Sequence, residues 1–309
     1  MRNATIRQLQ IFSVAASHLS FARAAENLHL THAAISLQIK QLEDVSGTLL
    51  FERIGKRVFL TEAGEILLNH TRQILQSLKE ADEALLALKG LKGGRIAVAV
   101  ASTAEYFAPG LLAQFRKTQA DLRIRLLIDN RDTVSRLLSG NEVDLAIMGR
   151  PPAQLDAVAV AFAPNPLVIV ANSDHPLSRM ASVAIEDLAG ETLIVREPGS
   201  GTRLAMEEFF DERSIKARIG MEMGSNEAIK QAVIAGMGVS FVSAHTISQE
   251  LRAGSVRVLD VQGFPLMLNW YVVHRRGKRL PPVAQAFKDF LLHDGTALIS
   301  QIVPFDPAI

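Results

Sequence analysis

The stretch SFARAAENLHLTHAAISLQIKQLE, residues 20–43, determines how the first part of this chain is expected to fold. Ser20 and Thr31 are predicted helix N-caps, because hydroxyls accept hydrogen bonds from the free backbone N–H groups of a first helical turn. The helix after Ser20 is short, and the helix after Thr31 should run to about Val45, where Gly47 ends it. Two capped helices within about 25 residues predict a helix-turn-helix.

The two faces of the second helix differ in polarity. One face is apolar at helical spacing and should pack inward, through Ile35, Ile39 and Leu42. The other face is polar, ends in a positive charge, and carries His32, Ser36 and Lys40. Such a face can enter a DNA major groove, where hydroxyl and imidazole groups meet base edges and an ammonium meets phosphate. The same pattern also fits the solvated face of an ordinary helix, and periodicity alone leaves both interpretations open.

A basic hairpin is predicted directly after the helix-turn-helix. The runs Leu50–Arg53 and Arg57–Leu60 are rich in strand-forming residues and flank a turn that contains Gly55. The basic residues at its tip are Arg53, Lys56 and Arg57. Beside a helix-turn-helix such a hairpin can lie over the adjacent minor groove or the phosphates, whereas alone it would be an ordinary solvated turn. Residues 1–60 hold seven Lys and Arg against four Asp and Glu, a net charge of +3.

A long amphipathic helix is expected from Thr61, a third predicted N-cap. Its apolar positions alternate in steps of four and three, at Leu67, Thr71, Ile74, Leu78, Ala81, Leu85 and Leu88. This is heptad spacing, and an isolated helix of about 30 residues needs a partner for such a stripe. The partner is either a second copy of the chain or the helix's own domain. Two-fold pairing would place two recognition helices on one duplex and predicts a pseudo-palindromic DNA site.

The rest of the chain alternates apolar strands with helices, which predicts an α/β fold with a parallel or mixed sheet. The expected strands are Arg95–Ala101, Leu122–Asp129, Glu142–Met148, Pro166–Val170, Glu191–Val195, Val239–Val242 and Leu266–His274. The expected helices are Ala104–Lys117, Val134–Ser139, one from near Leu204, and Val283–Leu292. The stretch Ala157–Ala171 contains Pro164, Asn165 and Pro166 and is expected to be a buried strand plus a turn. Two similar lobes are a natural interpretation, with a ligand beyond the carboxyl ends of the strands.

Small polar residues form three candidate sites near strand ends. Ser102 and Thr103 precede a helix, where hydroxyls and free N–H groups suit a carboxylate or a phosphate, and plain N-capping is the alternative. Residues 198–203, Pro-Gly-Ser-Gly-Thr-Arg, again lie between a strand and a helix, and the glycines let a ligand approach the backbone. Glycine-rich turns are common, so this second signal is weak alone. Residues 224–226, Gly-Ser-Asn, are a third candidate.

The composition disfavours several classes of protein. The 309 residues include no Cys, which excludes a disulfide, a thiolate metal site and a cysteine nucleophile. A secretory signal and an apolar run of about 18 residues are both missing, which argues against a membrane span and predicts a cytoplasmic protein. The sequence has no Gly-x-Ser-x-Gly, no His-Glu-x-x-His and no metal-spaced His/Asp cluster, so an enzyme is disfavoured. A secreted solute-binding protein would explain two lobes but not residues 1–90.

The first part of the chain resembles the signature of the LysR type of bacterial transcription regulator. The matching residues are Ser20-Phe21-x-x-Ala24-Ala25-x-x-Leu28-His29-Leu30-Thr31-x-x-Ala34-Ile35-Ser36-x-Gln38-Ile39-x-x-Leu42-Glu43, Gly47-x-x-Leu50-Phe51-x-Arg53 and Leu60-Thr61-x-Ala63-Gly64. The resemblance implies an N-terminal winged helix-turn-helix at residues 1–60, a dimerisation helix at 61–92, and a two-lobed α/β effector domain of the periplasmic-binding-protein type at 93–309. The first lobe would hold residues 93–165 and 269–309, and the second lobe residues 166–268.

The resemblance also implies site residues. It places the DNA contacts at Ser20, Arg23, Thr31, His32, Ala33, Ser36, Leu37, Gln38, Lys40, Arg53, Lys56 and Arg57. It places the effector contacts at Ser102, Thr103, Ala104, Arg150, Gly201, Thr202, Arg203 and Asn226. Within the family, the chain is similar to regulators of RuBisCO (Calvin-cycle) operons over Ser102–Pro109, Asn172–Leu177 and Arg196–Arg203.

Taken together, the resemblance implies a transcription regulator and not an enzyme. Its expected partners are double-stranded DNA, a second copy of itself in a homodimer or homotetramer, and RNA polymerase, with no membrane. A small metabolite is expected to set its activity, such as a phosphorylated compound or NADPH, and no bound cofactor or metal is expected. Another metabolic operon is the alternative target to the RuBisCO genes.

Overall fold

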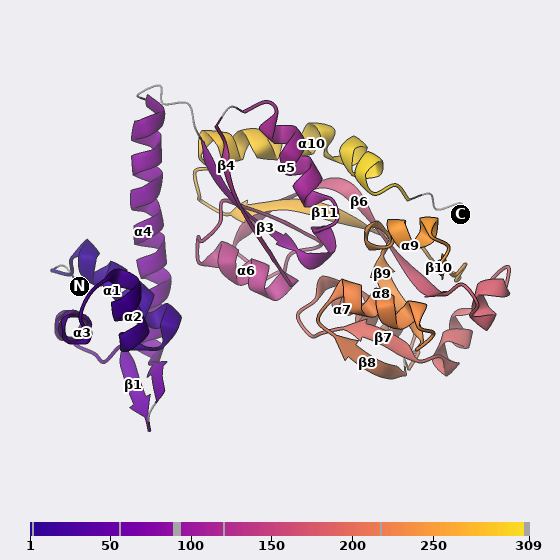
Figure 1. Cartoon of the computed structure of the whole chain (residues 1–309), viewed down its shortest axis with the longest axis horizontal. Helices are drawn as coiled ribbons and strands as arrows, with labels where there is room; N and C mark the ends of the chain where they lie inside the picture. The colour runs from indigo at the N-terminus through magenta and orange to yellow at the C-terminus, as the bar shows by residue number, and fades with distance from the viewer. Residues whose placement is uncertain (2, 56, 89–93, 120, 217, 306–309) are drawn as a thin grey trace. The chain divides into compact units, whose positions relative to one another are not determined.

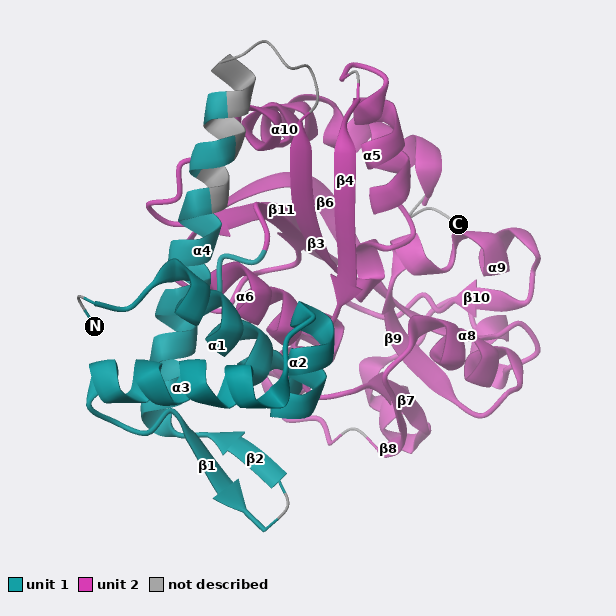
Figure 2. Ribbon diagram, turned by 60° about the vertical axis from the view of Figure 1, so that its left-hand side comes forward, with its two compact units in different colours: residues 1–91, 140–142 teal, residues 92–139, 143–309 magenta. Residues whose placement is uncertain are grey.

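The structure is a computed structural model, and it describes the chain except for residues 2, 56, 89–93, 120, 217 and 306–309 (Figure 1). The chain forms two compact units, one of residues 1–91 with 140–142 and the other of residues 92–139 with 143–309 (Figure 2). Among the described residues, no helix is long and apolar enough to cross a membrane. Each unit has its own core.

The first unit begins with a helix-turn-helix. Its helices are α1 (Ile6–His18), α2 (Phe21–Leu28) and α3 (His32–Ser46). The N-caps predicted at Ser20 and Thr31 are confirmed: their hydroxyls accept hydrogen bonds from the backbone N–H of Arg23 (3.4 Å) and Ala34 (3.2 Å). Gly47 ends α3 in the left-handed conformation, as predicted.

A two-stranded hairpin follows, formed by β1 (Phe51–Ile54) and β2 (Arg57–Leu60). Glu43 of α3 fixes its start, because its carboxylate accepts hydrogen bonds from the backbone N–H groups of Leu50 (2.8 Å) and Phe51 (3.3 Å). The next helix approaches the hairpin closely at Gly64, where a Cβ atom would lie 2.1 Å from the Leu50 carbonyl oxygen. Only glycine fits there without a shift of the backbone.

The long helix α4 (Glu62–Leu88) begins after Thr61, whose hydroxyl accepts a hydrogen bond from the Gly64 N–H at 3.0 Å and so confirms the third N-cap. Its predicted apolar stripe divides into two parts. Thr71 is buried in the unit's own structure, and Leu67 packs against the core beside the fully packed Leu68. Further along, large apolar side chains are exposed at Ile74, Leu78 and Leu85. The side chain of Leu88 lies outside the described residues.

The second unit is built on one mixed sheet in the order β4-β3-β5-β11-β6-β9-β7-β8, with β10 beside β6. Its strands are β3 (Arg95–Ala101), β4 (Arg123–Asp129), β5 (Leu145–Met148), β6 (Ala157–Asn172), β7 (Leu193–Arg196), β8 (Ile219–Met223), β9 (Val239–Ser243), β10 (Val256–Val258) and β11 (Leu266–Arg275). Strands β3, β4 and β5 are parallel at one end of the sheet, and β7, β8 and β9 are parallel at the other. The predicted mixed α/β fold is therefore confirmed.

Helices cover both ends of this sheet. They are α5 (Ala108–Arg116), α6 (Arg131–Ser139), α7 (Gly201–Asp211), α8 (Asn226–Ile234), α9 (Ser248–Arg252) and α10 (Pro282–Ile302). In Figure 1, α5 and α10 lie together on one side of β3 and β11, and α6 lies on the other. One core surrounds β3 and β5, and separate cores surround β7 and β9. We call the part around β3 to β5 the first lobe and the part around β7 to β9 the second lobe.

Two antiparallel strands run through both lobes. Strands β6 and β11 pair from Leu167 with Leu266 to Ala157 with Arg275. The turn expected at residues 164–166 is therefore wrong, because β6 continues through them. Pro164 and Pro166 are two residues apart, so their backbone nitrogens face the same side of the strand. On β6, strand β9 pairs only with residues 167–170. The prolines are tolerated because β6 has an open edge there among the described residues.

Several helix boundaries also differ from the prediction. The helix expected from Ala104 begins at Ala108, after the 3-10 turn η1 (Ser102–Ala104). The helix expected from near Leu204 begins at Gly201. The last helix, α10, extends ten residues past the expected end at Leu292. Long-range packing sustains it there, since the Thr296 hydroxyl donates to the Phe162 carbonyl of β6 at 2.7 Å.

Candidate functional sites

The exposed polar and basic side chains of α3 and the hairpin lie in the first unit, and we call this set the recognition face. His32, Lys40, Arg53 and Arg57 are exposed on it, and Ser36 is half-buried. The apolar side of α3 is buried, through Ile35, Ile39 and Leu42, as its spacing predicted. The chain's local pattern therefore turns the polar side of α3 outward, where a duplex can reach it.

Aromatic contacts connect the hairpin to the start of α3. The Arg53 guanidinium lies 5.8 Å from the centre of the Phe21 ring. The Phe21 ring in turn lies 6.2 Å from the ring of His32 and 5.1 Å from that of Phe51. Phe21 thus lies between Arg53 of the hairpin and His32 of α3 and contacts both. No role was predicted for Phe21 from the sequence, although it belongs to the motif that resembles the family signature.

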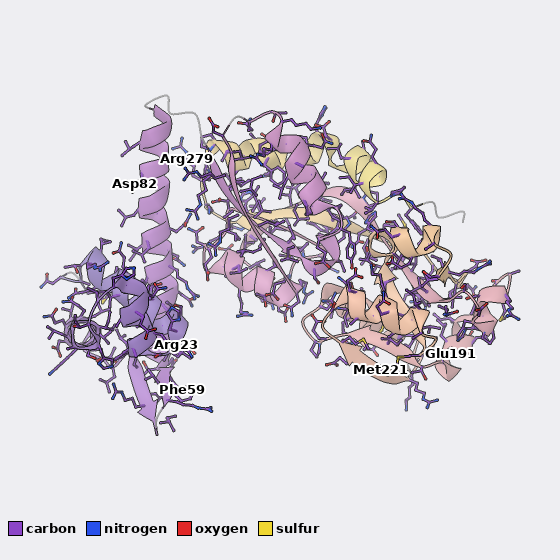
Figure 3. The ribbon with its side chains drawn as sticks, viewed as in Figure 1. Arg23, Phe59, Asp82, Glu191, Met221 and Arg279 are labelled. Atoms are coloured by element: carbon purple, nitrogen blue, oxygen red, sulfur yellow. The ribbon has the colours of Figure 1, made fainter. Side chains whose placement is uncertain are left out.

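The remaining residues predicted to contact DNA lie on the same unit. Thr31, Ala33, Leu37 and Arg23 are exposed, and Ser20 and Gln38 are half-buried. Arg23 on α2 and Phe59 on β2 are labelled in Figure 3. Ser20 and Thr31 each accept a backbone hydrogen bond as caps, which leaves their hydroxyl protons free to donate to a phosphate. Lys56 lies outside the described residues.

The second candidate site lies where strands of both lobes end, and we call it the strand-end cluster: Ser102, Asn130, Arg131, Arg196, Glu197 and Asn226. Arg196 ends β7 and is only 3% exposed. Its Nη1 donates to Asn226 Oδ1 at 2.6 Å, and its Nη2 donates to Ser102 Oγ at 3.0 Å. Ser102 belongs to the first lobe, so this arginine joins the two lobes.

Two buried donors in the cluster have no partner among the described residues. They are Nδ2 of Asn226 and Nε of Arg131. Arg131 begins α6 and contacts the second lobe, because an added Cβ on Gly201 would lie 3.6 Å from its Cδ atom. A buried donor without an acceptor is costly, so these groups favour a ligand with acceptor oxygens. The guanidiniums of Arg196 and Arg131 lie beside Glu197 (2.8 Å) and Asp132 (3.5 Å), and such groups bind anions in proteins.

The other predicted effector contacts are distributed unevenly. Thr103 and Ala104 are buried in η1 beside Ser102, and Thr202 is buried in the first turn of α7 after Gly201. Arg203 instead pairs with Glu207 on its own helix and donates to the carbonyl of Arg196 at 3.1 Å. Arg150 is exposed beyond β5 and has no hydrogen bond or ion pair among the described residues.

Several members of the cluster were not predicted from the sequence as site residues: Asn130, Arg131, Arg196 and Glu197. The available signal was positional. Residues 130 and 131 follow β4, which is parallel to β3 and ends at the same edge of the sheet. Arg196 follows the apolar run that was expected to be a strand. Residues beyond the carboxyl ends of parallel strands are candidate ligands in open α/β sheets.

A second bridge between the lobes lies at Tyr106, whose hydroxyl donates to Glu227 Oε1 at 2.8 Å. Burial, then its bond to the Glu227 carboxylate, raises the pKa of Tyr106 well above its ordinary range. Burial would raise the pKa of Glu227, but hydrogen bonds from Lys230 and Tyr106 outweigh it and lower that pKa. Lys230 also pairs with Glu250 at 2.9 Å. The tyrosine is therefore a neutral donor to a carboxylate that stays charged.

A buried histidine lies where β11 crosses between the lobes. His245 Nδ1 accepts a hydrogen bond from Trp270 Nε1 at 3.1 Å, and burial lowers the pKa of His245 to about 4. The imidazole is therefore neutral near pH 7. Among the described residues, no group of three or more His, Asp or Glu side chains could hold a metal ion.

Comparison with known proteins gives the same two-part division. A family model described as bacterial regulatory helix-turn-helix protein, lysR family, matches residues 6–65. A second, described as LysR substrate binding domain, matches residues 89–295. Together these models span the recognition face and the strand-end cluster.

Individual proteins are also similar to the chain. A RuBisCO operon transcriptional regulator of Allochromatium vinosum is 49% identical, over 95% of this chain and 97% of its own length. A RuBisCO operon transcriptional regulator of Acidithiobacillus ferrooxidans is 45% identical, over 94% of each chain. The CcmR regulatory domain of Synechocystis PCC6803, solved in complex with 2-PG, is 40% identical over 64% of this chain and 96% of its own, with a TM-score of 0.62.

Proposed function

The chain belongs to the LysR family of bacterial transcription regulators, and on this basis we propose that it controls a RuBisCO operon in response to a small phosphorylated carboxylate. The observation that carries the proposal is the pairing of two features in one chain. One is an exposed polar helix face beside a basic hairpin, and the other is a cluster of two arginines with buried, unpartnered donors. The first suits duplex DNA, and the second suits a small anion.

For DNA binding, α3 is proposed to enter the major groove of double-stranded DNA. Ser36 and His32 would meet base edges, and Lys40 would meet a phosphate. Arg53 and Arg57 of the hairpin would lie against the adjacent phosphates or minor groove. The remaining residues expected to contact DNA lie on the same unit, and we propose them as contributors to positioning.

For the effector, the guanidiniums and the unpartnered donors of the strand-end cluster support an anion. The CcmR regulatory domain, 40% identical to this chain, was solved with 2-PG. 2-Phosphoglycolate carries both a phosphate and a carboxylate, which match the two guanidiniums of Arg131 and Arg196. We propose the same class of ligand here, with contacts from Ser102, Thr103 and Asn226. NADPH is the alternative, and its phosphates would use the same donors.

For assembly, the exposed apolar residues of α4 support pairing with a second copy. Ile74, Leu78 and Leu85 are 41%, 43% and 58% exposed. We propose that they form the seam of a homodimer, which can pair again into a homotetramer on a pseudo-palindromic site. The proposed domains are residues 1–60, 61–92 and 93–309. As a regulator acting on promoters, the protein would work in the cytoplasm beside RNA polymerase.

The DNA proposal is tested by anisotropy titration of the full chain with a RuBisCO-operon promoter fragment and with a scrambled fragment. Replacing Ser36 with Ala should weaken binding to the promoter by about 1–3 kcal/mol and leave the scrambled fragment unaffected. Ser17→Ala is the matched control, because that exposed hydroxyl of α1 donates to its own helix at 2.8 Å. Equal losses on both fragments would refute base recognition by α3.

The effector proposal is tested on the same complex with 2-phosphoglycolate added. The ligand should change the affinity or the footprint of the wild-type protein, and Thr103→Ala and Thr202→Ala should abolish this response while operator binding is kept. Thr118→Ala is the control, because its hydroxyl donates to the Phe115 carbonyl at 2.7 Å outside the cluster. An unchanged response in both cluster variants would remove these residues from the site.

A further inference from the structure

The Arg196 guanidinium is already bound to a carboxylate of its own chain. Glu197, the next residue, accepts from Arg196 Nε with Oε2 at 2.8 Å and from Nη2 with Oε1 at 2.9 Å. This is the two-pronged geometry with which arginine binds carboxylates and phosphates of ligands. The Arg196 side chain is 2% exposed and the Glu197 side chain 23% exposed. The carboxylate therefore occupies the face of a buried guanidinium that a ligand anion would use.

The guanidinium has almost no donor to spare. It offers five N–H groups, and four hydrogen bonds account for four of them: two to Glu197, one to Asn226 and one to Ser102. A phosphate needs at least two donors for a two-pronged contact. One N–H of Nη1 remains unused, so a two-pronged contact with Arg196 requires one of its three partners to leave, and Glu197 is the charged one among them.

Glu197 is also tied to the opposite lobe. Its Oε1 accepts from Asn130 Nδ2 at 3.4 Å. Beside it, Gly199 has φ +87°, and an added Cβ would lie 2.9 Å from Asp132 Oδ2, so the lobes approach closely here. Removing Glu197 from Arg196 would therefore disturb a contact between the lobes as well as free a cation.

We propose that Glu197 is an internal counter-anion that a ligand phosphate must displace from Arg196, and that it thereby sets the affinity and charge selectivity of the site. The proposal rests on the anion-binding function proposed above and deepens it. A singly charged carboxylate exchanges poorly against another one, because the two attract the guanidinium equally. A doubly charged phosphate attracts it more strongly and makes the exchange favourable. The site therefore selects phosphate dianions over monocarboxylates.

A purely structural role for Glu197 makes the opposite prediction. If the carboxylate only holds Arg196 in place for the ligand, its loss would misplace the guanidinium and weaken anion binding. If it competes with the ligand, its loss would strengthen anion binding and reduce the preference for a dianion. The sign of the change in affinity therefore separates the two roles.

The test is calorimetric titration of the full chain with 2-phosphoglycolate, inorganic phosphate and glycolate. Glu197→Gln removes the charge and keeps the shape of the side chain. We expect this variant to bind phosphate-containing ligands about tenfold more tightly than the wild type, and the affinity for glycolate to rise by a larger factor. Glu197→Ala is the second variant, and it should change affinities in the same direction. Asp156→Asn is the matched control, because it removes one carboxylate from an exposed pair with Arg276 at 3.0 Å and should alter binding less than about twofold.

The possible results distinguish failure of the exchange at Glu197 from failure of the proposed anion-binding function. Weaker or unchanged binding in both Glu197 variants, with wild-type affinity for 2-phosphoglycolate intact, would overturn the exchange and leave the proposed function standing. Equal tightening in Asp156→Asn would reduce the effect to net charge and would also overturn it. If the wild-type chain and both variants bind neither 2-phosphoglycolate nor inorganic phosphate, the anion assignment falls and the exchange falls with it.

Discussion

The recognition face and the strand-end cluster carry similar side chains in opposite settings. On the recognition face, Arg57 and Lys40 are exposed and have no ion pair among the described residues. In the strand-end cluster, Arg196 is buried and bound to Glu197, Asn226 and Ser102. The first surface is ready to add contacts, whereas the second must exchange contacts it already has.

Substitutions in the two regions should therefore have different consequences. A side chain of the recognition face does little for the folded chain alone, so its loss should appear in DNA binding. A side chain of the cluster joins parts of one unit, so its loss should appear in stability as well as ligand response. Unbound polar groups at a surface are solvated by water, and buried ones are not.

The largest expected effect is the loss of stability when Arg196 is replaced, compared with the replacement of Arg57. Arg196→Ala leaves Glu197 without its cation and Asn226 Oδ1 without its donor, and should lower the free energy of unfolding of the second unit by about 3 kcal/mol. Arg57→Ala should change the stability of the first unit by less than about 0.5 kcal/mol. Urea unfolding of the full chain, with separate probes for each unit, measures both. Similar losses of unfolding free energy for the two variants would contradict the difference between the two surfaces.

The next effect is a pH dependence in the second unit. Burial lowers the pKa of His245 from 6.5 to about 4, so on acidification the unfolded chain takes up the proton before the folded chain does. Stability is therefore lost as pH falls from about 6.5 toward 4, by about 2 kcal/mol between pH 7 and pH 5. His245→Gln keeps an acceptor for Trp270 and should flatten this part of the urea-unfolding profile. A profile as steep as that of the wild type would exclude His245 as the cause.

A smaller effect is expected at the second bridge between the lobes. Tyr106→Phe removes the hydrogen bond to the charged Glu227 and should cost about 1 kcal/mol in unfolding free energy, together with a shift in effector affinity. Tyr271→Phe is the matched control, because the Tyr271 hydroxyl has no hydrogen bond among the described residues. Equal shifts from both variants would deny Tyr106 a role in joining the lobes.

The smallest effect is expected at the basic hairpin. Arg57→Ala should weaken binding to promoter and scrambled DNA alike, by less than about 1 kcal/mol, and should reduce the slope of log affinity against log salt by about 1. Anisotropy titrations between about 50 and 200 mM salt give that slope. A loss confined to the promoter fragment would instead make Arg57 a base-contacting residue.

The sequence predicted the first unit well because its signals are local. Ser20, Thr31 and Thr61 cap the helices that begin directly after them, and the spacing within α3 determines its buried face. The stripe of α4 was predicted as one feature, although Leu67 and Thr71 face the unit's own core while Ile74 and Leu78 are exposed. Periodicity identifies an apolar stripe but does not say what covers each part of it.

The second unit was predicted less completely because its decisive contacts are distant in the chain. The strand ends at Ser102 and Asn226 were identified, but their common partner Arg196 lies 94 and 30 residues away from them. The continuity of β6 through Pro164 and Pro166 depends on the limited extent of β9 beside it, which only the folded sheet determines. The length of α10 depends likewise on its contact with Phe162.

A DNase I footprint of the full chain on a RuBisCO-operon promoter, with and without saturating 2-phosphoglycolate, tests both proposed functions at once. We expect protection of a pseudo-palindromic site, because two recognition faces bind together, and a changed cleavage pattern when the ligand is added. Protection that follows no sequence would contradict this expectation. So would an identical pattern with and without a ligand that calorimetry shows to be bound.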